Sequence, residues 1–454
     1  MRFRITLSAA LLGLNAFALS STAQAESISE ALALAYANNP TLNAARATLR
    51  ATDERVPQAL ANWRPTITAN ASVGSTRTST GIGPDNIRNN ASMSLSIQQA
   101  LFRGFRTVNS TKQAEALVRA QRESLNATEQ DVLLSAAQAY VNVIRDTALV
   151  ALQRSSVEFL REQVRASKDQ FEVGEGTRTD VSQAEARHAE AQANLNSAIA
   201  NLNASRAVYE QVVGIEARNL SASTPVGRLM PRSVEEAIRL GEEYQPLLRQ
   251  AQHQVDAAAF NVKTIEGEQL PTVTLEGSIG RDWKPSQSVS TVNSASVLGR
   301  VSVPLYQGGA LSSRVRQAKE ELGQAEIQLD VLRNQIRANV ITAWGDYQAA
   351  EASITAAQAA VEAQQLALQG VIEEQRVGQR TTLDVLDSQR ELITQRSNLV
   401  TAQRNRIVSA YQLLSAMGRL DAEFLNLQVA RYEPTEHYSK VRDKWFGMRT
   451  PDGR

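Results

Sequence analysis

The sequence contains no cysteine among its 454 residues. This absence excludes disulfides, thiol catalysis, cysteine-bound metal and a lipid attached to an N-terminal cysteine. Histidine is almost as rare, and His188, His253 and His437 have no second ligand at metal-binding spacing. The sequence also lacks a Ser-His-Asp pattern and a phosphate-binding glycine loop. We therefore expect no enzyme, no cofactor and no metal site.

Aromatic residues are also scarce, and neither sign of charge is in clear excess. Only 5% of residues are aromatic although 43% are hydrophobic, so the apolar share is mainly Ala, Leu and Val. This composition favours long, closely packed helices over a thick globular core. The 48 basic and 47 acidic residues leave no basic surplus, and no nucleic-acid partner is expected.

Residues 1–25 have the pattern of a signal peptide. Arg2 and Arg4 precede the apolar stretch ITLSAALLGLNAFAL, and Ala23-Gln24-Ala25 provides a small-residue cleavage site. The apolar stretch is too short and too polar to span a membrane as a helix. We expect export and cleavage near Glu26, which leaves a mature chain with one more acid than base.

The remaining sequence is internally duplicated. SISEALALAYANNPTL (27–42) matches SVEEAIRLGEEYQPLL (233–248), and VGEGTRTDV (173–181) matches VGQRTTLDV (377–385). Two halves, 26–232 and 233–418, therefore share one plan and predict internal pseudo-symmetry. Residues 419–454 match nothing in the first half. We expect this last segment to close the structure around its middle or to remain partly loose.

Four segments have the two-residue periodicity of β-strands. They alternate apolar and small polar residues, as in TITANASVG (66–74) and SMSLSIQ (92–98). Strands are expected at about 65–76, 91–102, 271–282 and 295–305, forming two hairpins that each have one apolar and one polar face.

Most of the other residues have helical patterns. The stretches 106–172 and 310–376 contain no proline, and each of these rods would be about 100 Å long at the helical rise. Helices then return, so long hairpins occupy 106–213 and 310–417. A shorter helix is expected at about 41–63. Helices of this length need tertiary partners, so each rod should pack against its returning helix.

The repeated V-G phrase lies where each rod must end and the next helix begin. Gly174 and Gly378 suit the left-handed conformation that terminates a helix. Thr177 or Thr179 with Asp180 would cap the next helix, as would Thr381, Thr382 and Asp384 in the second half. A tight turn needs only a glycine and a cap, so it leaves the rest of the repetition unexplained.

The strands raise a question of closure. No other segment offers an apolar cover, and strands that face lipid cannot leave their edges unpaired. Four strands cannot enclose a barrel, so two, three or four chains would have to share one.

At this point the sequence resembles the TolC-like outer-membrane efflux and secretion channels. The resemblance covers essentially the whole mature chain and rests on the duplicated order, the two V-G phrases, LFRGFR (101–106) and LYQGGA (305–310). It implies a mainly α protein with a small β part, assembled as a homotrimer. Twelve strands would form a shared barrel in outer-membrane lipid, and the helices an α-barrel tunnel across the periplasm. A periplasmic adaptor and an inner-membrane pump would be its partners.

The resemblance also implies two sets of site residues. Asp384 and Asp387 would form two rings of carboxylates at a periplasmic constriction; a helix N-terminus by itself also favours acids. Arg380 would tie the hairpins together through Thr179 and Asp180, although Gln375 replaces a gating tyrosine of the best-known member. The expected adaptor-docking residues are Val173, Gly174, Thr177, Val377, Gly378 and Thr381.

Two other functions are alternatives to a transport conduit. A periplasmic adaptor would have one hairpin between β-rich flanks, and a structural coiled coil would not need alternating strands. The sequence leaves the cargo open among drugs, detergents and a secreted protein.

Overall fold

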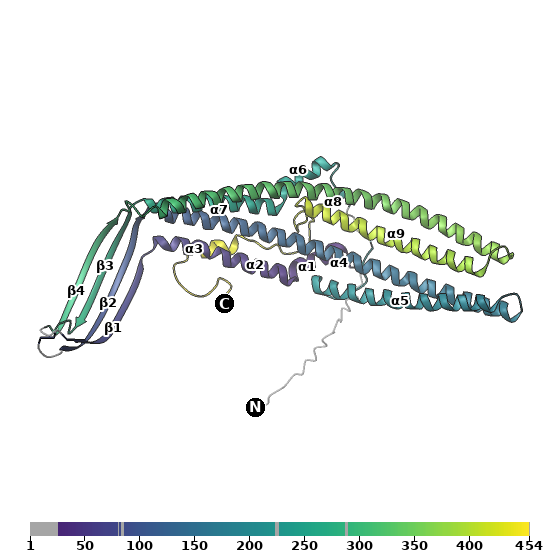
Figure 1. Ribbon diagram of the computed structural model, residues 1–454, viewed down its shortest axis with the longest axis horizontal. Helices are drawn as coiled ribbons and strands as arrows, with labels where there is room; N and C mark the ends of the chain where they lie inside the picture. Colours follow the sequence, from purple (N-terminus) through teal and green to yellow (C-terminus); the bar gives the residue numbers. More distant parts are fainter. Residues whose placement is uncertain (1–25, 80, 83–85, 223–226, 287–288, 454) are drawn as a thin grey trace, which may run out of the picture.

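The molecule is an elongated, curved bundle of helices with a sheet at one end. The computed structural model describes residues 26–79, 81–82, 86–222, 227–286 and 289–453. The signal peptide expected at 1–25 lies outside the described residues. Figure 1 shows long helices that lie side by side and lead from the sheet at one end to the hairpin tips at the other.

The sheet has four antiparallel strands in the order β1-β2-β3-β4. The strands are β1 (Thr66–Thr78), β2 (Asn86–Arg103), β3 (Thr272–Trp283) and β4 (Thr291–Ser302). β2 begins earlier than expected, at Asn86, where it pairs with Thr78. β4 ends at Ser302, ahead of Pro304, whose nitrogen has no hydrogen to donate to a ladder.

The register separates the sheet into two different faces. Ile67, Ile97, Gly277 and Val297 are paired across the strands on one face. On the other face serines are paired, and the hydroxyls of Ser278 and Ser296 lie 2.8 Å apart. The predicted alternation of an apolar and a polar face is confirmed. Both faces are open, because the helices begin where the strands end (Figure 1).

The two long rods are α4 (Arg106–Glu172) and α8 (Ala310–Arg376), each of 67 residues. Each is followed by a returning helix, α5 (Arg178–Val213) and α9 (Thr382–Ala416). α4 packs against α5 and α8 against α9, as expected for two helical hairpins, and α4 also packs against α9.

Shorter helices extend the returning helices toward the sheet. They are α1 (Ile28–Asn38), α2 (Pro40–Asp53), α3 (Arg55–Leu60), α6 (Val234–Tyr244) and α7 (Pro246–Glu266). The prediction of a single helix at 41–63 is wrong. The helix is interrupted at Glu54, and residues Ala61–Trp63 form a 3₁₀ turn. Pro57 follows the break, in the first turn of α3, where a missing N–H is tolerated. α7 lies along both α4 and α8, which the repeat pattern did not predict.

The largest core lies midway along the bundle. Tyr140 of α4 and Tyr209 of α5 are fully buried there. The Tyr140 hydroxyl is 2.7 Å from the carbonyl oxygens of Glu26 and Ser221, and Tyr209 donates to the Glu26 carboxylate at 2.5 Å. These bonds hold the start of the described chain and the junction between the two halves at the same position along the bundle, midway between its ends.

The C-terminal segment begins at this height and then leaves it. The Ala422 N–H donates to the Glu129 carboxylate of α4 at 2.8 Å, and burial raises the pKa of Glu129 to about 7. The chain then runs beside α2, where the short helix α10 (Glu436–Val441) places the His437 ring 3.0 Å from the buried Asp53 carboxylate. The segment therefore extends from the middle of the bundle toward the sheet.

Candidate gate and docking tips

Each hairpin tip is built by the same local rules. At the first tip Gly174 has φ +83°, and the N–H of Glu175 returns to the Gln170 carbonyl at 2.8 Å. At the second tip Gly378 has φ +75°, and the N–H of Gln379 returns to the Glu374 carbonyl at 2.9 Å. Left-handed glycines followed by such bonds end a helix sharply.

A threonine and an aspartate then start the returning helix. Thr177 and Asp180 form a reciprocal capping box, with the Asp180 N–H 3.2 Å from the threonine hydroxyl. Thr381 and Asp384 repeat it, with the Thr381 N–H 2.8 Å from the carboxylate. The structure therefore selects Thr177 over Thr179 as the first cap. The spacing of threonine and aspartate in the repeated phrase is accounted for by this box.

The turn does not account for the valines. Val173 and Val377 are 72% and 71% exposed, at matching positions of the two tips. Neither side chain is part of the capping box or the glycine turn. Val173 and Val377 follow the last residues of α4 and α8, and these helices end at the hairpin tips, the end of the bundle farthest from the sheet (Figure 1). Each tip therefore has one exposed apolar side chain at an equivalent position.

The two predicted gate acids have different surroundings. The Asp384 carboxylate accepts bonds from the Thr381 N–H and hydroxyl, which lower its pKa. Asp387, one turn further along α9, forms an ion pair with Arg187 of α5 at 2.9 Å. Asp384 thus caps its own helix, whereas Asp387 joins the second hairpin to the first.

Arg187 was missed by the sequence analysis. It also bonds Glu190 of its own helix at 3.0 Å, so it bridges two acids. A signal existed in the repeat, because Asp387 aligns with Gln183 and Arg187 aligns with Glu391. Complementary charges at positions where the two halves diverge indicate a contact that joins them.

Arg380 has a partner within its own tip. Its Nε donates to Glu374 at 2.8 Å, and this bond raises its pKa. Asp180 belongs to the Thr177 cap, and Thr179 is exposed beside it. Within one chain, Arg380 therefore does not bond Thr179 or Asp180. The bond that crosses between the hairpins here is Arg187–Asp387.

A cavity of about 350 Å³ lies behind this ion pair, between the two hairpins. Its walls include Leu160 of α4, Asn194 of α5 and Ile393 of α9, and Arg187 is at its edge. The ion pair is therefore not the sole link between the hairpins near their tips, because Phe159 of α4 also packs against a buried apolar cluster of α8 and α9 that contains Leu368 and Leu392.

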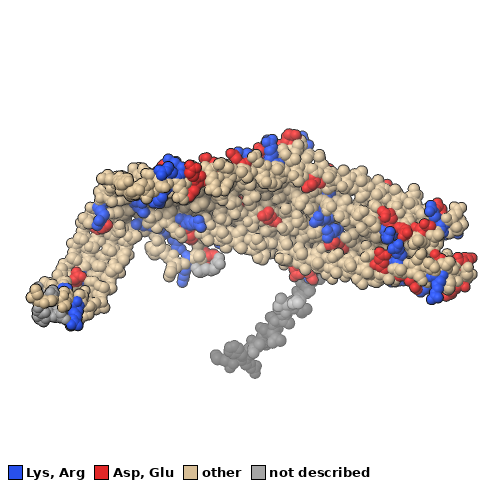
Figure 2. Space-filling model, viewed as in Figure 1, with Lys and Arg blue, Asp and Glu red and all other residues tan. Residues whose placement is uncertain are grey.

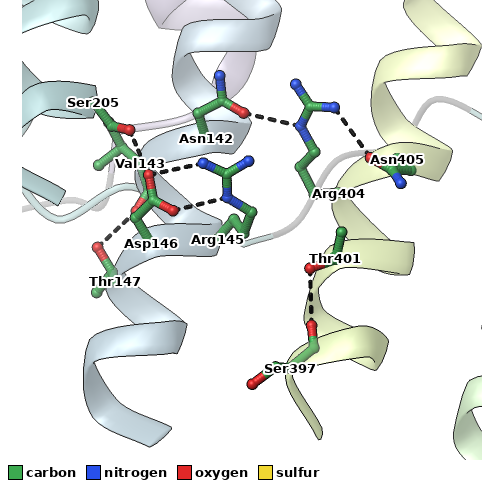
Figure 3. Close-up of polar contacts among 10 residues, drawn as sticks. All are labelled: Asn142, Val143, Arg145, Asp146, Thr147, Ser205, Ser397, Thr401, Arg404 and Asn405. Atoms are coloured by element: carbon green, nitrogen blue, oxygen red, sulfur yellow. Dashed lines mark hydrogen bonds and ion pairs between the residues drawn. The ribbon is translucent and has the colours of Figure 1, made fainter. Parts of the chain in front are cut away.

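Midway along the bundle, polar side chains join α4 to α5 within the first hairpin and α4 to α9 of the second (Figure 3). Asp146 of α4 is buried, receives two bonds from Arg145 at 2.8 and 3.0 Å, and accepts the Ser205 hydroxyl of α5. Arg404 of α9 donates to Asn142 of α4 at 2.9 Å, and its burial lowers its pKa. A buried carboxylate whose hydrogen bonds are satisfied favours one geometry, so the Asp146 contacts fix how α4 and α5 pack against each other.

Charge is distributed unevenly along the molecule. Figure 2 shows acidic and basic side chains gathered over the hairpin tips and few over the middle of the sheet. Within the described residues, no group of three or more His, Cys, Asp or Glu side chains is arranged to hold a metal ion. Of the helices in the described ranges, none combines the length and apolar character needed to cross a membrane.

The duplicated helical hairpins and the four-stranded sheet define a known class of protein. The outer membrane efflux protein family matches residues 31–214 and 238–419, one stretch in each half, and the chain belongs to this family. The predicted family, fold class and outer-membrane location are confirmed.

Individual relatives agree with this assignment. The chain is 42% identical to the outer membrane efflux protein BepC of Brucella suis biovar 1 (strain 1330), over 95% of this chain and 94% of BepC. It is 26% identical to the outer membrane protein TolC of Escherichia coli (strain K12), over 91% and 87% of the two chains. Among solved structures, CusC shares the fold with a TM-score of 0.76 at 17% identity, over 86% of this chain and 92% of that one.

Proposed function

We propose that three copies of this chain form the outer-membrane exit duct of an efflux system. The observation that carries the proposal is the sheet, whose β1 and β4 edges are both open while large apolar side chains cover one face. In lipid every backbone N–H and C=O at a sheet edge needs a partner. The β1 edge of one copy would pair with the β4 edge of the next.

The two faces fit such a shared barrel. The apolar face, with Ile97 and Val297, would contact lipid. The serine face would line a polar lumen, where Glu276 and Arg300 lie 3.5 Å apart. Three copies would supply twelve strands, enough for a lumen wider than one packed with side chains.

At the opposite end the hairpin tips would form a periplasmic gate. Asp384 and Asp387 would place six carboxylates near the tunnel mouth, of which three are paired with Arg187. The ion pair is half-exposed and each such pair contributes only about 0.2–1 kcal/mol. The hairpins would therefore separate at the tips while the bond from Arg404 of α9 to Asn142 of α4 keeps them joined midway along the bundle.

The exposed valines support adaptor docking at these tips. Three copies would display six equivalent knuckles, each with a left-handed glycine and a projecting Val173 or Val377. A ring of adaptor hairpins would contact all six, and linked weak contacts raise avidity strongly. An inner-membrane pump would supply the energy, and the channel itself would catalyse no reaction.

The family description and the relative at 42% identity both name efflux, so we propose efflux ahead of protein secretion. A periplasmic adaptor and a structural coiled coil are less consistent with an open, two-faced sheet.

Native mass spectrometry of the detergent-extracted protein tests the assembly. We expect a complex of three chains, because shared closure removes the sheet edges. A dominant monomer or dimer would contradict the proposal. Drug sensitivity and protein secretion after gene deletion would then distinguish the two cargo classes.

A further inference from the structure

The last described residues form a small loop that exposes large apolar side chains. Phe446 is 91% exposed and Met448 is fully exposed. Gly447, between them, has φ +106°, and the Lys444 ammonium closes the loop on the Arg449 carbonyl at 2.5 Å. The chain thus presents two apolar side chains at a turn with a basic residue on either side.

This loop is held at the base of the sheet. The Arg64 guanidinium donates to the Lys444 carbonyl at 2.6 Å and lies 4.9 Å from the centre of the Trp445 ring. Arg64 is two residues before β1 begins at Thr66. In Figure 1 the C-terminal chain loops beneath α3, toward the sheet end of the bundle.

Contacts made by the residues just before the loop hold it in this position. The Tyr438 ring lies 5.2 Å from the Arg122 guanidinium of α4, and the same helix's Glu115 is 3.5 Å from Arg442. Together with the His437–Asp53 bond, these contacts dock the segment on α2 and α4 immediately before the loop.

The base of the sheet already has the composition of a membrane interface. Trp63, Phe105 and Tyr306 are exposed there, at the ends of strands whose apolar face is open. Aromatic side chains gather at this level of membrane proteins because their rings suit the headgroup region. Trp445 and Phe446 extend the same band of aromatic residues.

We propose that the loop 444–449 inserts into the phospholipid leaflet at the periplasmic side of the outer membrane. Phe446 and Met448 would enter the acyl-chain boundary, while Lys444 and Arg449 would contact anionic headgroups. This chain has no cysteine to carry a lipid, so the loop would give each copy a second contact with the membrane besides its strands.

A neighbouring copy is the other possible cover for this loop. In the proposed trimer, the stretch that follows β4 of the next chain would approach Arg64. That stretch, 303–309, is VPLYQGG and contains no acidic residue. It would leave Lys444 and Arg449 without a counter-charge, whereas a leaflet that contains anionic phospholipid supplies one.

The inference rests on the proposed function and is tested separately from it. Because the chain has no cysteine, single cysteines at chosen positions label cleanly. An environment-sensitive fluorophore is attached to Phe446→Cys, Ile97→Cys or Glu216→Cys in the full chain. The labelled proteins are reconstituted in vesicles of phosphatidylethanolamine and phosphatidylglycerol that contain a lipid-borne quencher. Ile97 reports the sheet, and the exposed Glu216 of the half-junction reports the aqueous side.

We expect the labels at positions 446 and 97 to be quenched and the label at 216 to stay unquenched. Arg449→Gln should weaken quenching at 446 in these vesicles, because it removes a headgroup contact and keeps the loop's backbone bond. Quenching at 97 with none at 446 would overturn the inference alone. An unquenched label at 97 would overturn the proposed membrane sheet as well.

The neighbouring-copy alternative has its own readout. Phe446→Cys is combined with Tyr306→Cys and oxidised in the same vesicles. A disulfide between chains would overturn the inference, because the loop would then be covered by protein. Chains that remain uncrosslinked, with the label at 446 quenched, support insertion.

Discussion

The rods α4 and α8 have equal length and the same place in the repeat, but they have very different surroundings. Twenty-two of the residues of α4 are buried and seven of those of α8. α4 lies between α5, α7, α9 and the short helices of its own half, whereas α8 lies at the edge of the bundle. Tyr140 is fully buried, while its equivalent Trp344 is only half-buried.

The difference indicates which surface of the chain is available to pack against another molecule. α8 exposes Ile327 and Val331, 66% and 63% accessible and one turn apart, where α4 has Glu123 and Ala127. A duplicated sequence that becomes apolar on one outer surface is adapted to pack against another molecule. In the proposed trimer α8 would be the helix that contacts the next chain.

Ile327→Glu gives the largest expected effect, because it installs the first half's residue at this surface. A carboxylate buried without a partner costs several kcal/mol. We expect the trimer to be lost while the helical content of each chain persists, as native mass spectrometry and circular dichroism will report. Gln328→Glu is the matched control, since it adds the same charge to a neighbouring exposed position. If Ile327→Glu assembles like the control, α8 is not the contact surface.

The second prediction compares the two hairpin tips. Replacing both Gly174 and Gly378 with tryptophan should lower adaptor affinity about a hundredfold, because six linked contacts are lost. Either replacement alone should have a smaller effect if the tips are equivalent. Gly81→Trp is the control, since Gly81 also has positive φ and open space but lies in the strand loop at the other end. If adaptor crosslinking persists in the double variant, the repeated V-G phrase forms the turn but does not dock the adaptor.

The third prediction concerns the charge difference between the halves. Asp387→Gln gives α9 the residue that α5 has at position 183 and removes the ion pair with Arg187. We expect conductance in planar bilayers to rise by up to about fivefold, with weaker block by multivalent cations. Arg187→Gln should raise conductance similarly, and the double variant should add little to either.

Glu190→Gln is the control for that series, because it removes the other acid that bonds Arg187 and leaves α9 untouched. If conductance changes in Glu190→Gln but not in Asp387→Gln, the Arg187–Asp387 ion pair does not contribute to the gate. Asp384→Asn is expected to act chiefly on the cap of α9, with a cost of about 1 kcal/mol in local stability.

The smallest expected effect is at mid-height, where Glu129 of α4 aligns with the exposed Arg333 of α8. Its folded pKa of about 7 is above its ordinary value of 4.5. The folded state therefore holds a proton that the unfolded segment loses, and stability falls as pH rises from about 4.5 to 7. Glu129→Gln should remove this dependence and stabilise residues 419–432 by about 1 kcal/mol at pH 8. Hydrogen exchange of these amides at several pH values measures it, and an unchanged pH profile would contradict the assignment.

Much of the fold followed from local rules. The bounds of both rods were predicted to the residue, because a long stretch without proline ends at a glycine and a threonine cap. The strands were found from alternation alone, with errors of a few residues at their ends. The break at Glu54 was missed because a periodic helical pattern continues across it.

Only part of the candidate site could be predicted from the sequence. The tip turns were predictable because glycine and capping residues act within one turn of helix. The contact of Arg187 with Asp387 was not predicted, because it joins residues 200 positions apart. The Asp146 and Arg404 contacts at mid-height likewise depend on how α4, α5 and α9 lie side by side.

The sequence by itself therefore determined the duplication, the lengths of the rods, the two-faced strands and the chemistry of the turns, since each depends on neighbours a few residues away. Only the tertiary structure decided that α4 is central and α8 peripheral, that Asp387 is paired while Asp384 is a cap, and that the C-terminal loop reaches the sheet. The physical reason is that equivalent segments of a repeat have equal local preferences. Their burial depends on which of them the rest of the chain covers.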